Sequence, residues 1–493
     1  MTRGFYLPFA EQVDPAANAR IQALTASLLE LPLPGLSDIV PGYANLYLEY
    51  DSRQLSQRQI QAWVAHKLAE IASAPEGRQV EIPVVYDGED LPEIARRTGL
   101  STAQVIERHA APTYRVFAVG FTPGFPFMGA VEPTLRLARR AVPRTRVPAH
   151  SVAMANQQTG IYPLASPGGW HLLGHSLRAV YDPRRPQPFL LEAGDRVRFI
   201  PAEGKHLDPP QALSLLPQPH SPLMQVEEPG LLDLLVDGGR SLVGRFGLAQ
   251  SGPLDRYSFD RANALVGNAA DTLALELTLL GPTFTLLASV VLAFAGYGMQ
   301  PLLNGEALPV AQSFAVKPGD TLAFKPLANG VRGYLAVAGG LQGEVFWGSS
   351  SVDFKGLIGK PLAAGDILGL AKARSVRPGF ALEHRLLERY IRLLPGPQFS
   401  PQALRALTTT TFTVISGDRM GLRLGGGLVP GGEVLSEATP LGAVQVPPSG
   451  EPLVLLNDRG RLGGYAKPAT VHPADLWKIA QTRPGESIRF IQG

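Results

Sequence analysis

The N-terminal part of the chain shows two stretches of helical periodicity on either side of a strand-like alternation. Apolar residues recur with helical spacing over about 15–31 and again after Ser56. Between these stretches, residues 39–50 have the pattern of a strand pair. Amphipathic helices need a sheet on which to bury their apolar faces, so this pattern predicts a small α/β subdomain over residues 1–78.

The pattern changes to β after Gln79. EIPVVY (81–86) and YRVFAVGF (114–121) have the composition and alternation of strands. Between them, Ser101 is followed three positions later by Gln104, which is the form of a helix capping box. We therefore expect a β-rich domain over residues 79–205 that carries a helical excursion.

A repeated phrase indicates that the β architecture continues to the end of the chain. Glycine and an acid form a turn that leads into an alternating strand, and the acid can bond nearby backbone amides. The phrase occurs in LEAGDRVRFI (191–200), VKPGDTLAFK (316–325), LAAGDILGL (362–370) and TRPGESIRFI (482–491). Four such turns predict related β modules in which one face of each strand lies on a barrel core.

Prolines mark the main boundary. Between Glu203 and Gly230 the chain contains six prolines and little periodicity, which is typical of a linker. We expect Gln211–Glu228 to be exposed. The predicted organisation is an α/β subdomain, a β-barrel, a Pro-rich linker and two further β modules, with bounds at 1–78, 79–205, 206–224, 225–375 and 376–493.

The stretch from Leu277 to Gly305 contains no charged residue and is long enough to cross a bilayer. Gly281-Pro282, Gly296 and Gly298 interrupt it, and its Val, Thr and Ser residues suit strands. We therefore predict successive buried strands here and no association with a membrane.

Composition narrows the partners and the chemistry. The net charge is +3 and the basic residues are scattered, which argues against nucleic acid as a partner. The absence of cysteine excludes disulfides, a thiolate zinc site and a cysteine nucleophile. No segment has the P-loop form, and no methionine precedes a lysine as in the usual biotin-attachment motif. Glu11 interrupts the first apolar residues too early for a signal peptide, so we expect a cytoplasmic protein.

GFTPGFPFMG (120–129) is an uncharged segment that is neither a helix nor a central strand. Pro123 and Pro126 remove backbone donors, and its glycines permit positive φ angles. Such a loop either caps a core or lines a pocket, and composition favours the cap.

Several long motifs resemble one family of proteins. GFTPGFPFMG, PRTRVPAHSV (143–152) and TGIYPLASPGGWHLLGHS (159–176) resemble the B subunit of 5-oxoprolinase, also described as allophanate hydrolase subunit 1 or as kinase-inhibitor-like. The C subunit of the same system, which is similar to the carboxyltransferase region of urea amidolyase, is resembled by GLAQSGPLDRYSFDRANALVGN (247–268), LELTLLGPTF (275–284), YLAVAGGL (334–341), SGDRMGLRLGG (416–426) and VLLNDRGRLGGYAKPATV (454–471). The chain departs from the family pattern at MANQQTG (154–160), at GSSSVDFKG (348–356) and at Arg461-Leu462, where threonines are common.

The resemblance implies a fused B–C pair that is mainly β, with tandem cyclophilin-like β-barrel modules after a small ferredoxin-like α/β subdomain. It implies a component of an ATP-dependent 5-oxoprolinase that uses ATP and Mg²⁺ and acts on a small-molecule lactam together with a separate 5-oxoprolinase A-subunit-like protein. A carboxyltransferase supplied by a biotinylated carrier, with no biotin attached to this chain, and a non-catalytic histidine-kinase inhibitor are the alternatives. A homo-oligomer is compatible with each of them.

The resemblance also marks candidate site residues, and it reverses the interpretation of GFTPGF from a cap to a pocket wall. The catalytic candidates are Asp255, Glu276, Asp458 and Lys467. The candidates for binding substrate or nucleotide are Gly120, Phe121, Pro123, Gly124, Phe125, Arg144, Arg146, Trp170, His175, Arg256, Asn263, Asp418, Arg419 and Arg459. Asp418 or Asp458 is the expected Mg²⁺ ligand. No protein metal centre is predicted, because His171 and His175 have no obvious third ligand.

The residues themselves support plainer roles for several of these candidates. SGPLDRYSFDRANALVG (251–267) is typical of a helix capped by Ser251, and Arg256 and Asp260 have the spacing of a surface ion pair. Glu276, alone in an apolar strand, is either structurally paired or a base with a raised pKa. The Asp-Arg pairs at 418–419 and 458–459 bind an anionic ligand, or each pair locks its own loop.

The candidates occur in both halves of the chain, so we expect one composite pocket between the halves. Phe121, Phe125 and Trp170 would form its apolar wall. Its charged wall would contain Asp255, Arg256, Asp458 and Lys467.

Overall fold

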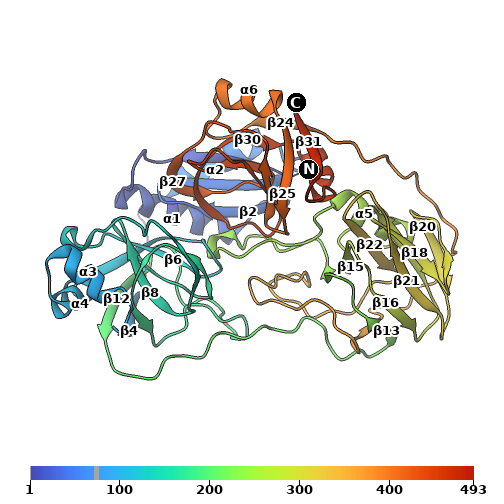
Figure 1. The fold of residues 1–493 in the computed structure, drawn as a ribbon, viewed down its shortest axis with the longest axis horizontal. Helices are drawn as coiled ribbons and strands as arrows, with labels where there is room; N and C mark the ends of the chain where they lie inside the picture. Colours follow the sequence, from blue (N-terminus) through green and yellow to red (C-terminus); the bar gives the residue numbers. More distant parts are fainter. Residues whose placement is uncertain (1, 72–76) are drawn as a thin grey trace.

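The computed structural model describes residues 2–71 and 77–493, which form three lobes (Figure 1). In this view the barrel lies at the left and a two-sheet unit at the right. In the upper lobe, the N-terminal α/β unit packs beside the C-terminal module, so the two ends of the chain lie in the same lobe. The fold is therefore mainly β with a small α/β unit, as the sequence predicts.

The α/β unit is a three-stranded antiparallel sheet in the order β1-β3-β2, covered by two helices. Asp14 caps the first helix, and Ser56 with Gln59 forms a capping box at the second. Ile21 and Leu24 pack on Leu48 of the sheet. The elements are β1 (Thr2–Pro8), α1 (Pro15–Glu30), β2 (Leu36–Pro41), β3 (Asn45–Asp51) and α2 (Gln57–Glu70).

The second unit is a closed barrel in the order β11-β4-β12-β5-β6-β9-β8, in which β12 runs parallel to β4. Two helices follow β4, and the predicted capping box of Ser101 and Gln104 is confirmed at the second of them. The strands are β4 (Gln79–Val85), β5 (Thr113–Val119), β6 (Pro126–Gly129), β8 (Ser151–Ala155), β9 (Gln158–Ile161), β11 (His171–Ser176) and β12 (Arg196–Pro201). The additions are α3 (Leu91–Thr98), α4 (Thr102–Ala110) and a ribbon of β7 (Arg144–Val147) with β10 (Ser166–Gly168).

The third unit consists of a six-stranded and a five-stranded sheet that share one apolar core. The first sheet contains β13 (Pro222–Glu228), β16 (Thr283–Leu286), β18 (Met299–Leu303), β19 (Glu306–Ala307), β21 (Thr321–Pro326) and β23 (Ile367–Gly369). The second contains β14 (Asp233–Val236), β15 (Ala274–Thr278), β17 (Val290–Gly296), β20 (Gln312–Val316) and β22 (Arg332–Val337), with α5 (Arg256–Leu265) beside it. Four of these strands lie in the uncharged stretch Leu277–Gly305 or overlap it, which confirms that prediction. In the described part of the chain, no helix combines the length and apolarity needed to cross a membrane.

The last unit is an eight-stranded sheet in the order β24-β31-β25-β26-β29-β28-β30-β27, with two short helices. Its apolar core includes Phe412, Val444 and Phe490. Its strands are β24 (Tyr390–Pro395), β25 (Thr411–Gly417), β26 (Gly421–Gly425), β27 (Glu433–Ala438), β28 (Ala443–Val446), β29 (Leu453–Leu455), β30 (Leu462–Val471) and β31 (Ser487–Gln492). Its helices are α6 (Pro401–Thr409) and α7 (Leu476–Ala480).

All four repeated Gly-acid turns lead into strands, namely β12, β21, β23 and β31. In each turn the acid accepts a hydrogen bond from the backbone N–H three residues earlier. The distances are 2.9 Å to Asp195, 2.8 Å to Asp320, 2.8 Å to Asp366 and 2.7 Å to Glu486. The acid therefore closes the turn, as the sequence predicts.

The proline-rich segment differs from the expected exposed linker. Leu213 pairs with Ile358, Leu215 is buried, and residues 222–228 form β13 between β16 and β23. Pro222 is tolerated because it is the first residue of its strand. The prediction that Gln211–Glu228 is exposed throughout is therefore wrong, because apolar side chains in this segment complete the core of the third unit.

Candidate functional site

Residues 457–462, which follow β29, contact all the other units of the molecule. Asn457 donates to the backbone carbonyls of Ser251 and Pro253 at 2.9 and 3.0 Å. Leu462 lies against Gly120 of the barrel, and its N–H donates to the Gly120 carbonyl at 3.4 Å. Arg459 reaches the α/β unit. We call residues 457–462 the junction loop.

Three ionised side chains form a buried network beside this loop. Arg419 Nη1 donates to Glu276, and Arg419 Nε lies 2.7 Å from Asp458 Oδ2. All three side chains are no more than 3% exposed. The Asp-Arg pairs therefore do not lock their own loops, because Arg419 of one loop is paired with Asp458 of the other.

Glu276 accepts further hydrogen bonds from Leu254 N at 2.9 Å and from the Tyr334 hydroxyl at 2.6 Å. Burial opposes its ionisation, but Arg419 and Arg332 outweigh burial and hold the Glu276 pKa below its ordinary value. Of the two roles left open by the sequence, structural pairing fits this environment. A base with a raised pKa does not.

Asp255 is the N-cap of α5, so the predicted cap at Ser251 is wrong. Its carboxylate accepts from Ser258 N at 2.9 Å, from Ser258 Oγ at 2.6 Å and from Gln481 Nε2 at 2.8 Å. Burial raises the pKa of Asp255 to about 6, although these hydrogen bonds favour the ionised form. Among the catalytic candidates, Asp255 therefore has the environment suited to proton exchange near neutral pH.

GSSSVDFKG, where the chain departs from the family pattern, folds around Asp237 and Arg240. Asp237 accepts from Ser349 Oγ, Ser350 N and Ser351 Oγ. Arg240 Nη2 donates to the Ser351 carbonyl at 2.5 Å. Burial and the neighbouring Asp458 carboxylate raise the pKa of Asp353 in this segment to about 6.

Two further buried ion pairs join the junction loop to the α/β unit. Arg459 Nη2 lies 3.1 Å from Glu49 Oε2, and Arg461 Nη2 lies 2.5 Å from Asp38 Oδ2. All four side chains are at most 1% exposed. Arg461 is a departure from the family pattern, and here it holds the α/β unit to the last module.

Lys467, on β30, is fully buried and pairs with Glu437 at 2.9 Å. It also donates to the Tyr465 carbonyl at 3.1 Å, and Asn45 of the α/β unit donates to Glu437 at 2.8 Å. Burial lowers the pKa of Lys467, and Glu437 opposes this effect. The contacts described for Lys467 thus tie two units together and do not connect it to Glu276, Arg419 or Asp458.

The GFTPGF loop lies at the junction of the halves. Gly124, with φ +77°, donates to the carbonyl of Phe246 at 2.8 Å. Phe125 is buried with Trp170, Tyr162 and Phe127, whereas Phe121 is 41% exposed. The buried Pro123 lies between them in the same loop. The loop therefore caps the aromatic core with Phe125 and exposes only Phe121 among the predicted apolar wall.

The remaining binding candidates have local partners. Arg256 bonds Asp260 at 2.6 Å and Asp271 at 2.5 Å, which confirms the expected surface pair. The other candidates and their contacts are Asn263 with the Thr272 carbonyl, Asp418 with Lys355, Arg144 with Glu89 and Asp90, His175 with Asp87, and Arg146 as an exposed residue of β7. These contacts do not join the network around Arg419.

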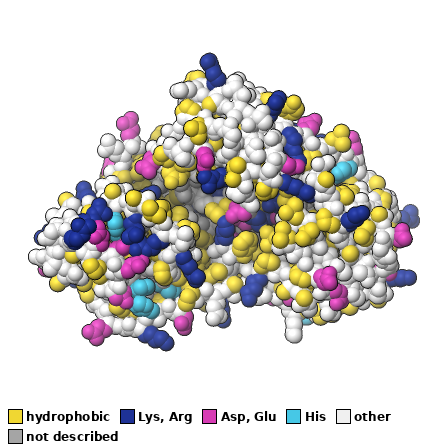
Figure 2. Space-filling model, in the orientation of Figure 1, with side chains coloured by type: hydrophobic (Ala, Val, Ile, Leu, Met, Phe, Trp, Pro, Cys, Tyr) yellow, Lys and Arg dark blue, Asp and Glu magenta, His cyan; other side chains and the backbone are white. Residues whose placement is uncertain are grey.

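Figure 2 shows a hollow where the three lobes meet, with acidic and basic side chains gathered on its wall. A cavity of about 150 Å³ also lies at the junction of the halves. Arg115 and Glu192 line it from the barrel, and Arg245 and Phe246 from the rear half. The halves face one another as expected, but this cavity is not lined by the residues proposed for the composite pocket.

Sequence reasoning missed the residues that complete these networks. Asp38, Glu49 and Arg332 each stand in an apolar strand, and all three are buried. This is the signal that singled out Glu276, and it applied equally to them.

Comparison with known proteins places the two halves separately. The carboxyltransferase domain family matches over residues 246–492 through its subdomains A and B, and over residues 2–191 through its subdomains C and D. The B subunit of 5-oxoprolinase from Escherichia coli O157:H7 is 42% identical over 198 residues, covering 38% of this chain and 88% of that protein. The C subunit of 5-oxoprolinase from Escherichia coli K12 is 34% identical over 282 residues, covering 55% of this chain and 91% of that protein. The crystal structure of TTHA0988 superimposes with a TM-score of 0.97 at 57% identity and covers 100% of both chains.

Proposed function

The chain belongs to the carboxyltransferase-domain family, and we propose that it serves as a fused counterpart of the B and C subunits of 5-oxoprolinase in the ATP-dependent opening of 5-oxoproline to glutamate. The observation that carries the proposal is the order of the matches along one chain, with a B-like part followed by a C-like part. The buried Arg459–Glu49 and Arg461–Asp38 pairs support it, because they hold the two parts together as one unit.

A lactam carbonyl is a poor electrophile, and transfer of the γ-phosphoryl group of ATP to its oxygen would create a leaving group. Water would then attack the activated carbon, the ring C–N bond would break, and phosphate would leave to give glutamate. We assign activation to this chain and ring opening to a separate A-subunit-like protein. Asp255 is the carboxyl group best suited to move a proton at this site, because its pKa of about 6 is close to neutral pH.

The structure argues against direct phosphate binding by Arg419 and Arg459. The guanidinium of Arg419 is used by Glu276, Asp458 and the Gly252 carbonyl, and Arg459 by Glu49 and the Thr439 carbonyl. We assign both as positioning residues that fix the junction loop. The expected Mg²⁺ ligands do not fit either, since both Asp458 oxygens accept from Arg419, and Asp418 faces Lys355.

The test is a coupled measurement of glutamate and ADP with the purified chain, ATP and 5-oxoproline, in the presence and absence of a cognate A-subunit-like protein. The proposal expects product only in the combined reaction. Turnover by this chain alone would contradict the assigned division of labour. Failure with every cognate partner would remove the 5-oxoprolinase assignment.

A carboxyltransferase acting on an amide is the second candidate, because the matching family is described by that activity. It requires a biotinylated carrier on another chain. Transfer of labelled carboxylate from carboxybiotin to urea, with no requirement for ATP in that half-reaction, would favour it over the 5-oxoprolinase proposal.

A further inference from the structure

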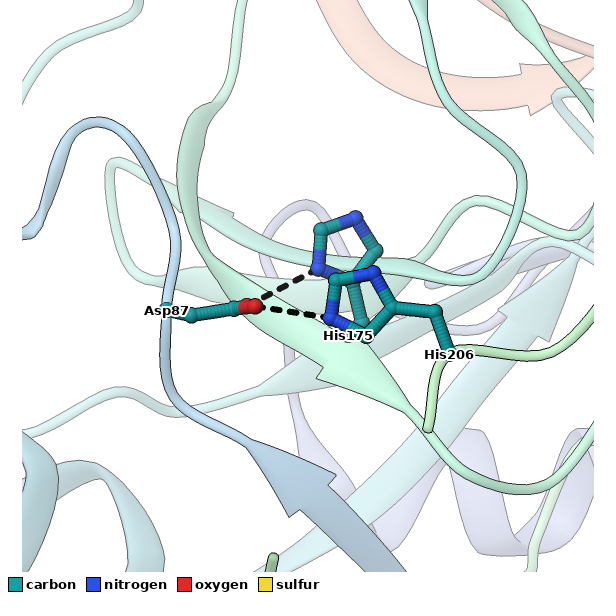
Figure 3. Close-up of side chains that lie close together, drawn as sticks. All are labelled: Asp87, His175 and His206. Atoms are coloured by element: carbon teal, nitrogen blue, oxygen red, sulfur yellow. Dashed lines mark hydrogen bonds and ion pairs between the residues drawn. The ribbon is translucent and has the colours of Figure 1, made fainter. Parts of the chain in front are cut away.

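Asp87, His175 and His206 converge on one point of the barrel surface (Figure 3). Asp87 Oδ1 lies 2.9 Å from His175 Nδ1, and Asp87 Oδ2 lies 2.7 Å from His206 Nε2. The two imidazole rings stack with their centroids 3.9 Å apart. One potential ligand atom from each residue lies within 4.8 Å of the other two.

The three residues come from three separate segments. Asp87 follows β4, and His175 lies on the neighbouring strand β11, opposite Val85. His206 belongs to the segment that leaves the barrel after β12 and crosses toward the rear half. No third partner for His175 could be found along the sequence, because these residues meet only in the folded chain.

We propose that Asp87, His175 and His206 bind a divalent transition-metal ion, which clips the crossing segment to the barrel. Two imidazole nitrogens and one carboxylate oxygen are a ligand set that suits Zn²⁺ and neighbouring metals. Metal–ligand bonds of about 2.0–2.1 Å in a tetrahedral site place the ligand atoms roughly 3.4 Å apart. The contacts of 2.7 and 2.9 Å therefore need to open only slightly to admit the ion.

Protons balance in a defined way. In the metal-free form, protons on the facing nitrogens of His175 and His206 bond the Asp87 carboxylate. A bound ion replaces these protons with metal–ligand bonds, so the protons leave to solvent or move to the other ring nitrogens. The side chains of Asp87, His175 and His206 are 40%, 22% and 46% exposed, which leaves room for water as a further ligand.

The test uses the full chain stripped with a chelator and titrated with Zn²⁺ by calorimetry. We expect one ion per chain, and binding weakened by about tenfold or more in His175→Ala, in Asp87→Asn and in His206→Ala. His66→Ala is the matched control, because His66 also pairs with a carboxylate, Glu70 at 3.2 Å, and belongs to no such cluster among the described residues. His66→Ala should bind Zn²⁺ as the unaltered chain does.

Limited proteolysis gives a second readout that does not depend on affinity. Zn²⁺ should slow cleavage near residue 206 in the unaltered chain and in His66→Ala, and it should have no effect in His206→Ala. His206 is half-exposed, so this variant retains the fold, which thermal unfolding without metal will verify. Equal binding by His206→Ala and the unaltered chain would overturn the site. Micromolar Zn²⁺ that neither binds nor protects the unaltered chain would do the same.

Discussion

The guanidinium of Arg419 bonds the Asp458 carboxylate through Nε at 2.7 Å and through Nη2 at 3.3 Å, although the two residues belong to different loops. Arg419 also reaches Glu276 in the third unit. One cation thus compensates two buried carboxylates from two units of the molecule. Because a buried charge is costly without a partner, this arrangement makes the junction sensitive to the loss of Arg419.

Arg419→Ala should destabilise the chain by about 3–5 kcal/mol, because it leaves Glu276 and Asp458 buried without their cation. Urea unfolding monitored by tryptophan fluorescence measures the change. Arg423→Ala is the control, since Arg423 forms an exposed pair with Glu451 and should cost about 1 kcal/mol or less. Equal stability of the two variants would show that the buried network contributes nothing beyond a surface pair.

Asp255 should impose a pH dependence on stability. Its pKa in the folded state is about 6, above the ordinary value of 3.8, so the folded chain holds this proton more tightly. Its contribution to stability is complete below about pH 4 and is lost as the pH rises to about 6, by a total of about 3 kcal/mol. Asp255→Asn removes the titration and keeps an acceptor for the Ser258 N–H.

The measurement is urea unfolding of the unaltered chain and of Asp255→Asn from pH 4 to pH 8. The difference between their free energies of unfolding isolates this group, because other groups titrate in both proteins. The difference should move in favour of the variant between about pH 4 and 6 and then stay constant. Parallel profiles would show that burial does not raise the Asp255 pKa.

Local rules predicted much of this fold, because the interacting residues lie close together in the sequence. The capping box at Ser101 and the acid of each Gly-acid turn are examples, and both involve partners three residues apart. The start of α5 was mislocated because Ser251 and Asp255 are both good caps, and only the tertiary contact of Asp255 with Gln481 distinguishes them. The pairing of Arg419 with Asp458 was not predictable, since each Asp-Arg sequence also satisfies a local pair.

Gly124→Ala should destabilise the barrel by about 1–3 kcal/mol. The residue has φ +77°, and an added Cβ would lie 2.8 Å from Tyr181 Cβ, which cannot move freely in the core. Gly99→Ala isolates the conformational part, because Gly99 has φ +72° at the end of α3 and open space around its Cβ position. Thermal unfolding should show a larger loss for Gly124→Ala, and equal losses would exclude a contribution from the Tyr181 clash.

Lys467→Met should cost less than Arg419→Ala. Glu437 keeps hydrogen bonds from Asn45 at 2.8 Å and from Gln398 at 2.7 Å after the ammonium is removed, so it is not left without donors. We expect a loss of about 1–3 kcal/mol, and most of it should return in the double variant Lys467→Met/Glu437→Gln. A double-mutant cycle measures the coupling. Additive effects would mean that the 2.9 Å pair contributes no coupling energy.

Cutting the exposed part of the crossing segment, near residues 203–210, should leave the two halves associated. The front half contributes Asp38 and Glu49, and the rear half contributes Arg461 and Arg459, so both buried pairs survive the cut. Separation would expose four charges to water but would also uncover the apolar contact of Leu462 with Gly120. Gel filtration of the nicked chain at micromolar concentration should give one peak that contains both fragments. Nicked Asp38→Ala, in which the buried Arg461 loses its partner, should release its fragments at lower urea concentration. Clean separation of the unaltered fragments in buffer would show that the junction depends on the covalent link, and would leave the buried pairs without the holding role assigned to them.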